Sequence, residues 1–115
     1  MHRGEIWLGN LNPNRGAEVG KIRPVLIVQA DFLIAQGDPT IIVLPLTSRV
    51  RKSKEPLHVT IPAREHLEQS CQVMPEAPRT LDRTRLIEGP LTHLTQAEMQ
   101  AVERSLEAVL GLLCR

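Results

Sequence analysis

Two apolar runs decide the fold of this chain: Ile22-Arg23-Pro24-Val25-Leu26-Ile27-Val28-Gln29 and Thr40-Ile41-Ile42-Val43-Leu44-Pro45-Leu46-Thr47-Ser48. Val, Ile and Leu dominate both runs, which is typical of strands buried on both faces. Arg23 cannot lie unpaired in a core without a large desolvation cost, so we expect it at its strand end, where the core meets water. If the strands pair antiparallel, Arg23 and the hydroxyls of Thr47 and Ser48 lie near the same end of the sheet. A fixed guanidinium beside hydroxyls is a site for an anion or a phosphate.

The rest of the chain is also mostly β. Residues 5–11 predict a first strand, and the Asn-, Gly- and Pro-rich segment 12–21 predicts the loop that joins it to the Arg23 strand. Further strands are expected at 57–61, 72–74 and 80–81, with a short helical turn within 30–36 and a turn or short helix within 62–69.

The clearest element is an amphipathic helix near the C-terminus. Thr95 and Glu98 form a Thr-x-x-Glu capping box, and Leu94 with Met99 supplies the hydrophobic staple. Apolar residues then recur at helical spacing: Met99, Val102, Leu106, Val109, Leu110 and Leu113. We therefore expect one helix laid on a β-barrel or twisted sheet, with its apolar face in the core; a groove for a partner is the alternative.

Length and composition describe a small folded protein. The 115 residues suit one domain, residues 1–115, with one core. A hydrophobic content of 42% and a net charge of +1 favour a folded chain over a disordered one. Aromatic residues are scarce (Trp7 and Phe32, with no Tyr), so nucleic-acid binding would depend on clustered basic residues rather than on stacking.

The sequence also indicates a location. No run approaches the roughly 18 to 20 apolar residues that span a bilayer. The N-terminus shows no signal-peptide pattern. We therefore expect a cytoplasmic protein without a membrane partner, in which Cys71 and Cys114 stay as reduced thiols.

Basic residues gather in a loop and in a later segment. They are Arg49, Arg51, Lys52 and Lys54 in the loop, and Arg79, Arg83 and Arg85 in the later segment. Such a run is more often a solvated loop than a binding site. If the two clusters meet on one face, they form a patch that follows the phosphates of RNA or DNA.

A second set of residues suits RNA cleavage without a metal: Glu18, Arg23, Thr47 and Ser48, with Glu76 as a candidate fifth member. Such cleavage needs a base for the 2′-OH proton, a cation for the phosphorane and an acid for the leaving 5′-oxygen. Carboxylate, guanidinium and hydroxyl groups cover these roles, although Arg, whose pKa lies far above neutral pH, is a reluctant proton donor. The plainer alternative is that Glu18 is a loop charge, Arg23 pairs with a carboxylate and Thr47 caps a turn.

Motifs for metals and cofactors are missing from the sequence. The four His residues show no spacing of zinc type. No Gly-x-Gly-x-x-Gly, Walker loop or Gly-x-Ser-x-Gly occurs. We therefore expect neither a metal nor a cofactor.

Five blocks of the chain, in order, resemble the MazF/PemK (Kid-type) toxins. They are Arg3-Gly4-Glu5-Ile6-Trp7, Gly16-Ala17-Glu18-Val19-Gly20, Arg23-Pro24-Val25-Leu26-Ile27-Val28-Gln29, Leu46-Thr47-Ser48, and Glu76-Ala77-Pro78-Arg79-Thr80-Leu81-Asp82 followed by Arg85-Leu86. One such block alone is weak, but five in the right order span nearly the whole chain and make the resemblance specific.

The resemblance implies a toxin of a toxin–antitoxin pair with a compact SH3-like or CcdB-like β-barrel that forms a homodimer. Such toxins cut single-stranded RNA at short sequences without a metal and leave a 2′,3′-cyclic phosphate and a 5′-hydroxyl. A small cognate antitoxin protein silences them by laying its C-terminal segment along the dimer groove. Position by position, Arg23 and Thr47 match the catalytic pair of MazF-type members, and Glu18 matches an acidic residue assigned to RNA binding or proton transfer.

These matches define the expected site. Arg23, Thr47 and Glu18 are the candidate catalytic residues. The candidate RNA contacts are Ser48, Arg49, Arg51, Lys52, Glu76 and Arg79.

Three positions depart from the Kid-type branch. That branch places a His just before the loop glutamate and uses an Arg and an Asp, where this chain has Ala17, Met74 and Glu76. The resemblance therefore favours an Arg/Thr scheme over a His/Arg/Asp scheme, and the base stays open between Glu18 and Glu76.

Two other functions are alternatives from the sequence alone. One is a gyrase poison on the same barrel; such proteins resemble CcdB and depend on a Trp-Gly-Ile C-terminus, whereas this chain ends Leu112-Leu113-Cys114-Arg115. The other is a non-catalytic module that binds RNA or an antitoxin.

Overall fold

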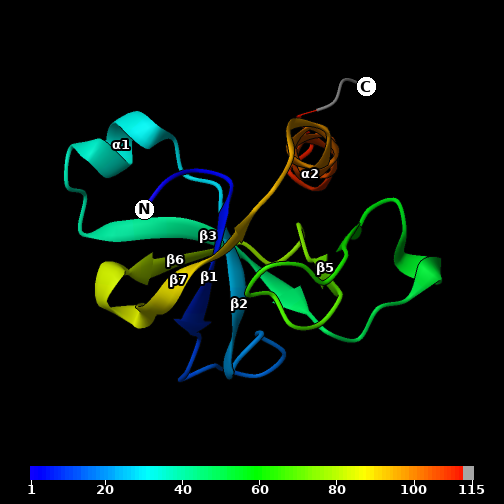
Figure 1. The fold of residues 1–115 in the computed structure, drawn as a ribbon, viewed down its shortest axis with the longest axis horizontal. Helices are drawn as coiled ribbons and strands as arrows, with labels where there is room; N and C mark the ends of the chain where they lie inside the picture. Colours follow the sequence, from blue (N-terminus) through cyan, green and yellow to red (C-terminus); the bar gives the residue numbers. More distant parts are fainter. Residues whose placement is uncertain (113–115) are drawn as a thin grey trace.

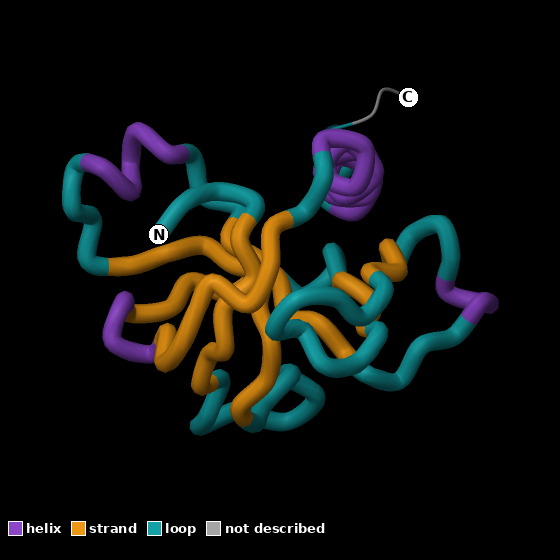
Figure 2. Tube along the Cα trace, in the orientation of Figure 1, coloured by secondary structure: helices purple, strands orange, loops and turns teal. Residues whose placement is uncertain are grey.

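A long central strand organises a curled antiparallel sheet in the computed structural model, which describes residues 1–112 (Figures 1 and 2). The elements in order are β1 (Glu5–Asn10), β2 (Ile22–Ile27), α1 (Asp31–Ala35), β3 (Thr40–Thr47), the 3₁₀ helix η1 (Lys52–Lys54), β4 (Val59–Ile61), β5 (Cys71–Val73), β6 (Arg79–Asp82), the 3₁₀ helix η2 (Arg83–Arg85), β7 (Leu86–His93) and α2 (Gln96–Val109). The predicted class, mainly β with a C-terminal helix, is confirmed.

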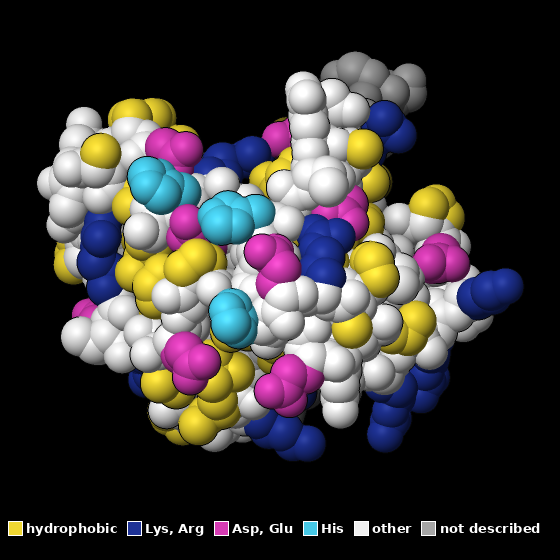
Figure 3. Space-filling model, in the orientation of Figure 1, with side chains coloured by type: hydrophobic (Ala, Val, Ile, Leu, Met, Phe, Trp, Pro, Cys, Tyr) yellow, Lys and Arg dark blue, Asp and Glu magenta, His cyan; other side chains and the backbone are white. Residues whose placement is uncertain are grey.

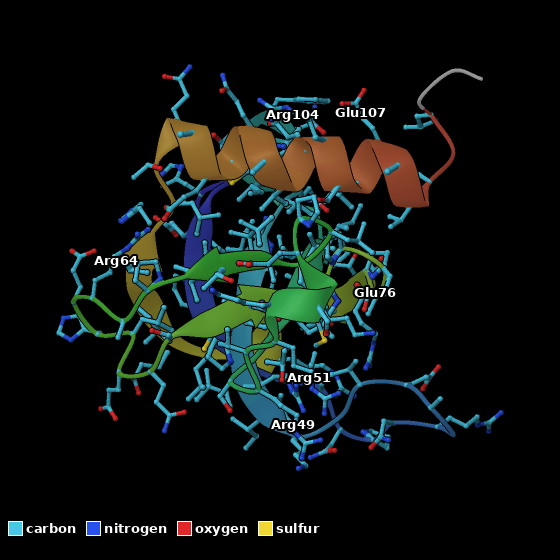
Figure 4. All side chains as sticks on the ribbon, turned by 90° about the vertical axis from the view of Figure 1, so that its right-hand side faces the viewer. Arg49, Arg51, Arg64, Glu76, Arg104 and Glu107 are labelled. Carbon is cyan, nitrogen blue, oxygen red and sulfur yellow. The ribbon has the colours of Figure 1, made fainter. Side chains whose placement is uncertain are left out.

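The central strand is β3, because it pairs with three others. The strand order is β4-β5-β3-β2-β1-β7, and β6 also pairs with β3. The first half of β3 pairs with β6, as in Ile41↔Leu81, whereas its end pairs with β5, as in Leu46↔Val73. This change of partner along one strand curls the sheet into a half-barrel, and Figure 4 shows α2 lying along one side of it.

Side chains of β2 and β3 alternate between the two faces of the sheet. Leu26 and Leu44 belong to one core cluster, whereas Ile27 and Val43 belong to another. All four are fully buried. The prediction that both runs are buried on both faces is confirmed for these central residues.

The register of β2 and β3 decides what lies at their shared end. The strands pair antiparallel, with Val25 opposite Pro45 and Ile27 opposite Val43. Continued by two residues, the same register places Arg23 opposite Thr47. The expected pairing is therefore confirmed.

Helix α2 begins at the predicted cap. The amide of Glu98 donates to Thr95 Oγ1 at 3.1 Å, and the amide of Thr95 donates to Glu98 Oε1 at 2.8 Å. Val102 is fully buried, and Met99 and Leu106 pack against the same core cluster. Leu110 is 57% exposed because the helix ends at Val109, so its predicted core position is wrong. Leu113 and Cys114 lie outside the described residues.

Two stretches of the sheet differ from expectation. Strand β7 was not predicted, because Gly89-Pro90 interrupts it and its middle residues are exposed. It pairs with β1, and a Cβ on Gly89 would lie 2.4 Å from Trp7 Cδ2, so only glycine fits against that ring. Residues 62–69 form a turn closed by an Arg64–Leu67 bridge, which is the first of the two predicted options.

Arg64 fastens this turn to α2. Its Nη1 and Nη2 donate to both carboxylate oxygens of Glu98, at 2.9 and 2.7 Å, and Nη2 also donates to the His93 carbonyl at 2.6 Å. The hydrogen bond from Arg64 lowers the pKa of Glu98 from its ordinary value, against the opposing effect of burial. Both side chains are mostly buried, so this ion pair is better shielded from water than a surface pair.

We expect Arg64→Met to lower the free energy of unfolding by about 2 kcal/mol at neutral pH, because it removes a charged hydrogen-bonded partner. A carboxyl with a lowered folded-state pKa stabilises fully above its unfolded pKa and loses that effect as the pH falls through the folded value. The difference from the wild type should therefore shrink in acid. Urea unfolding at fixed protein concentration measures it, with the exposed Arg104→Met as control; a pH-independent difference would contradict the assignment.

One negative result completes the description of the fold. Neither described helix has the length and apolar character that crossing a membrane requires, for residues 1–112.

Candidate active site

Arg23 and Thr47 line one groove of about 760 Å³. Arg23 comes from the start of β2 and Thr47 from the end of β3. Ser48 and Arg49, from the loop that follows β3, line the same groove. The structure thus brings four of the predicted site residues together, two at the strand ends and two in the loop that follows β3.

The Arg23 side chain is held by backbone oxygens. Its Nε donates to the Gly20 carbonyl at 3.0 Å, and Nη1 approaches the Leu46 carbonyl at 3.4 Å. The ion pairs within residues 1–112 involve other residues, so the alternative in which Arg23 pairs with a carboxylate is not observed. A guanidinium has five N–H donors, and these contacts use two, which leaves a half-buried cation with donors for an anion.

Thr47 closes the turn that follows β3. Its Oγ1 accepts a hydrogen bond from the amide of Arg49 at 3.1 Å. This hydrogen bond makes Thr47 a turn cap, as the alternative without RNA cleavage expected, and it fixes the position of the Thr47 hydroxyl. Because Oγ1 acts only as an acceptor here, its own hydrogen can still be donated to an oxygen in the groove.

The groove is also lined by acidic and polar residues that the sequence analysis missed. They are His66, Glu68 and Gln69 from the turn at 62–69, and Glu88 from β7. No local pattern marks them, because the folding of the sheet alone brings these segments beside β2 and β3.

Cys71 also lines the groove, but its thiol is poorly reactive. It is 3% exposed, and its Sγ donates to the Gln69 carbonyl at 3.3 Å. Burial raises the pKa of the Cys71 thiol, against the opposing charge of Arg23. The group is therefore a thiol and not a thiolate at neutral pH, which makes it a poor nucleophile. Within residues 1–112 Cys71 is a free cysteine, and Cys114 lies outside the described residues.

Glu18 lies in a second pocket, of about 330 Å³, rather than in the groove of Arg23. Glu76 and Arg79 line this pocket as well. The loop at 11–21 joins the two places, because the Gly20 carbonyl accepts from Arg23 and the adjacent Val19 carbonyl accepts from Arg79 Nη1 at 3.1 Å. Glu18 and Glu76, the two candidate bases, thus line the same pocket. Residues 19–20 of the loop connect this pocket with the Arg23 guanidinium.

The arginines of the later basic segment donate hydrogen bonds to backbone carbonyls of neighbouring segments. Arg79 Nη1 donates to the Leu11 carbonyl at 3.2 Å as well as to Val19, Arg83 Nη2 donates to the Ile34 carbonyl at 2.6 Å, and Arg85 Nη1 donates to the Asn10 carbonyl at 3.2 Å. Charged donors satisfy these carbonyls and stabilise the loops beside β1 and α1. A count of basic residues in the sequence cannot distinguish this role from RNA binding.

The basic loop itself is exposed. Arg49, Arg51, Lys52 and Lys54 are all exposed, and Lys and Arg project from the right-hand edge of Figure 3, over the segment that holds η1. Figure 4 shows Arg49 and Arg51 on the side of the molecule away from α2. The fully buried Gln72 fixes this loop, because its amide accepts from the Arg51 amide at 3.2 Å and donates to the Arg51 carbonyl at 3.0 Å.

A pair that the sequence analysis missed adjoins the second pocket. His58 is buried, and its Nε2 lies 2.8 Å from Glu76 Oε2. The alternating pattern of 57–61 predicted a strand but gave no partner for this His. Elsewhere in residues 1–112, no three His, Cys, Asp or Glu side chains converge to hold a metal ion.

Comparison with known proteins identifies relatives over nearly the whole chain. The family model described as PemK-like, MazF-like toxin of type II toxin–antitoxin system matches residues 2–110. Endoribonuclease MazF of Staphylococcus saprophyticus is 40% identical over 113 residues, which cover 97% of this chain and 92% of that protein.

Solved structures share the fold. MazF from Deinococcus radiodurans superposes with a TM-score of 0.81 at 24% identity and covers 96% of both chains. An endoribonuclease in complex with its cognate antitoxin, from a mycobacterial species, gives a TM-score of 0.76 at 22% identity, covering 100% of this chain and 99% of that one. At these identities the structures establish the fold alone.

Proposed function

This chain belongs to the PemK-like, MazF-like toxins of type II toxin–antitoxin systems, and we propose that it is an endoribonuclease that cuts single-stranded RNA at short sequences without a metal ion. One observation supports the proposal most: Arg23, from the start of β2, and Thr47, from the end of β3, line the same groove, as joint action on one phosphodiester requires. The name of the relative that is 40% identical supports the same activity.

The reaction is an internal transesterification. The 2′-oxygen of the nucleotide before the cut attacks phosphorus and the bond to the 5′-oxygen breaks, which gives a 2′,3′-cyclic phosphate and a 5′-hydroxyl. The 2′-OH proton passes to a base, and the leaving 5′-oxygen gains a proton. Arg23 stabilises the charge that builds up on the phosphorane and assists the leaving oxygen, and Thr47 and Ser48 hold the phosphate by hydrogen bonds.

The second pocket contains Glu18 and Glu76, the two carboxylates that can act as the general base. Either Glu18 or Glu76 accepts the 2′-OH proton, and the other positions the RNA with Arg79. Arg49, Arg51 and Lys52 contact the RNA backbone, because exposed cations on a fixed loop attract phosphates independently of sequence.

The partners follow from the family. We propose that the protein acts as a homodimer in the cytoplasm, where its RNA substrate is, and that a cognate antitoxin protein silences it. The family is defined by toxin–antitoxin pairs, and the mycobacterial structural neighbour was solved with its cognate antitoxin, which supports the second part.

The purified protein, incubated with a long RNA in EDTA, should cut at one short motif. Polynucleotide kinase should label the new 5′ ends without prior dephosphorylation, because these ends carry a hydroxyl. Loss of cleavage in EDTA would contradict metal independence. Intact RNA together with gyrase inhibition would support a gyrase poison, and binding without cleavage would support a non-catalytic module.

A further inference from the structure

His58 is buried beside an exposed segment. It is 6% exposed, whereas residues 51–57, which precede it, are all exposed. Its backbone amide donates to the Lys54 carbonyl at 2.9 Å, so its position is tied to the basic loop. The imidazole is therefore fixed by packing and by the backbone.

The ring contacts one residue of the second pocket. His58 Nε2 lies 3.0 Å from Glu76 Oε1 and 2.8 Å from Oε2, so one ring nitrogen spans both carboxylate oxygens. The Glu76 side chain is 45% exposed and lines the pocket that also contains Glu18. A fixed ring thus holds a carboxylate whose other side is open to the pocket.

The surroundings of the two ring nitrogens favour one tautomer of His58. His58 Nδ1 is buried and has no hydrogen-bond partner in the described structure. A hydrogen on Nδ1 would be a buried donor without an acceptor, which is costly. Nε2 faces both carboxylate oxygens of Glu76, so a hydrogen on Nε2 makes a favourable N–H···O contact, whereas a lone pair on Nε2 would be repelled by them.

We infer that His58 is a positioning residue: its Nε2–H orients the Glu76 carboxylate toward bound RNA, and this role rests on the proposed function. Water could satisfy a carboxylate that is nearly half exposed, so the contact is not needed to compensate for burial of Glu76. Its effect is to restrict the side chain to one orientation. Orientation of this kind changes reaction rates because small displacements of a contacting group are costly in the transition state.

Single-turnover cleavage of one RNA oligonucleotide tests the inference. His58→Leu removes the donor and should lower the rate about tenfold, and Glu76→Gln, which removes the carboxylate itself, should lower it at least as much. His58→Gln, whose side-chain amide reaches a similar position, should retain most of the activity. The double variant His58→Leu/Glu76→Gln should be no slower than Glu76→Gln alone, because His58 acts only through that carboxylate.

Two further variants keep the test decisive. His58→Asn replaces His58→Leu if the latter does not fold, because the shorter amide does not reach Glu76 and should be equally slow. His93→Leu is the matched control: His93 Nε2 lies 3.3 Å from Glu5 Oε2, a similar contact outside the groove and the pocket, and its loss should leave cleavage unchanged. Wild-type rates for both His58→Leu and His58→Asn, or additive losses in the double variant, would overturn the inference.

A spectroscopic measurement separates this inference from the proposed function. Nitrogen-15 NMR of the ring should show the tautomer protonated on Nε2 in the wild type, with a changed shift in Glu76→Gln. A ring protonated on Nδ1 would overturn the inference even if RNA is cut. If the wild type does not cut RNA, the proposed function fails, while the spectrum still shows whether His58 holds Glu76.

Discussion

An RNA with a 2′-deoxy nucleotide directly before the cut should bind this protein and remain intact. The expected loss is complete, because the proposed reaction uses that 2′-oxygen as its nucleophile and the protein supplies no substitute. Cys71, the thiol that lines the groove, is buried and has a raised pKa, so it cannot take over this role at neutral pH. Gel analysis of end-labelled oligonucleotides measures the cleavage, and fluorescence anisotropy measures the binding.

The control places the deoxy nucleotide one position further along the same oligonucleotide. That RNA should be cut at the normal position, because its attacking hydroxyl is intact. Cleavage of the first oligonucleotide at an undiminished rate would show that water or a protein group attacks the phosphorus, and would remove the chemical basis for the assigned roles.

Arg23→Ala should lower the cleavage rate by about a hundredfold to a thousandfold, because a positioned donor to developing negative charge is worth that much in comparable sites. The protein should still fold. Arg23 is half-buried at a strand end, and the acceptors that it leaves behind are two backbone carbonyls, those of Gly20 and Leu46. Single-turnover kinetics together with thermal unfolding separate the two effects.

Two further variants serve as comparisons for Arg23→Ala. Arg23→Lys keeps the charge but loses the planar fork, so its rate should fall between those of the wild type and Arg23→Ala. Arg104→Ala removes an exposed arginine of α2, which Figure 4 shows far from Arg49 and Arg51, and should not change the rate. A folded Arg23→Ala protein with wild-type activity would remove Arg23 from the reaction.

Local patterns in the sequence predicted the parts of this fold that local physics decides. The runs of β2 and β3 are apolar on both faces because both faces are buried, and antiparallel pairing brings the start of β2 near the end of β3. The cap of α2 was predictable because Thr95 and Glu98 satisfy each other's backbone amides within one turn. Arg23 and Thr47 could therefore be placed together from the sequence.

The rest of the site depends on contacts between distant segments. Glu88 lies on β7, whose pattern is broken by Gly89-Pro90, and His66 reaches the groove only because the turn at 62–69 folds back against the sheet. Glu18 was grouped with Arg23 by residue type, but the loop at 11–21 turns it into a separate pocket with Glu76. No spacing rule marks a buried His such as His58 as the partner of a carboxylate eighteen residues away.

The most direct test of the central claim, that Arg23 and Thr47 act on one phosphodiester, is a double-mutant cycle on single-turnover RNA cleavage with Arg23→Ala, Thr47→Val and the double variant. If both side chains hold the same phosphate, the double variant should be faster than the product of the two single effects predicts, by about tenfold or more. Single effects that multiply without coupling would show that the two residues act at separate places, and would contradict the account.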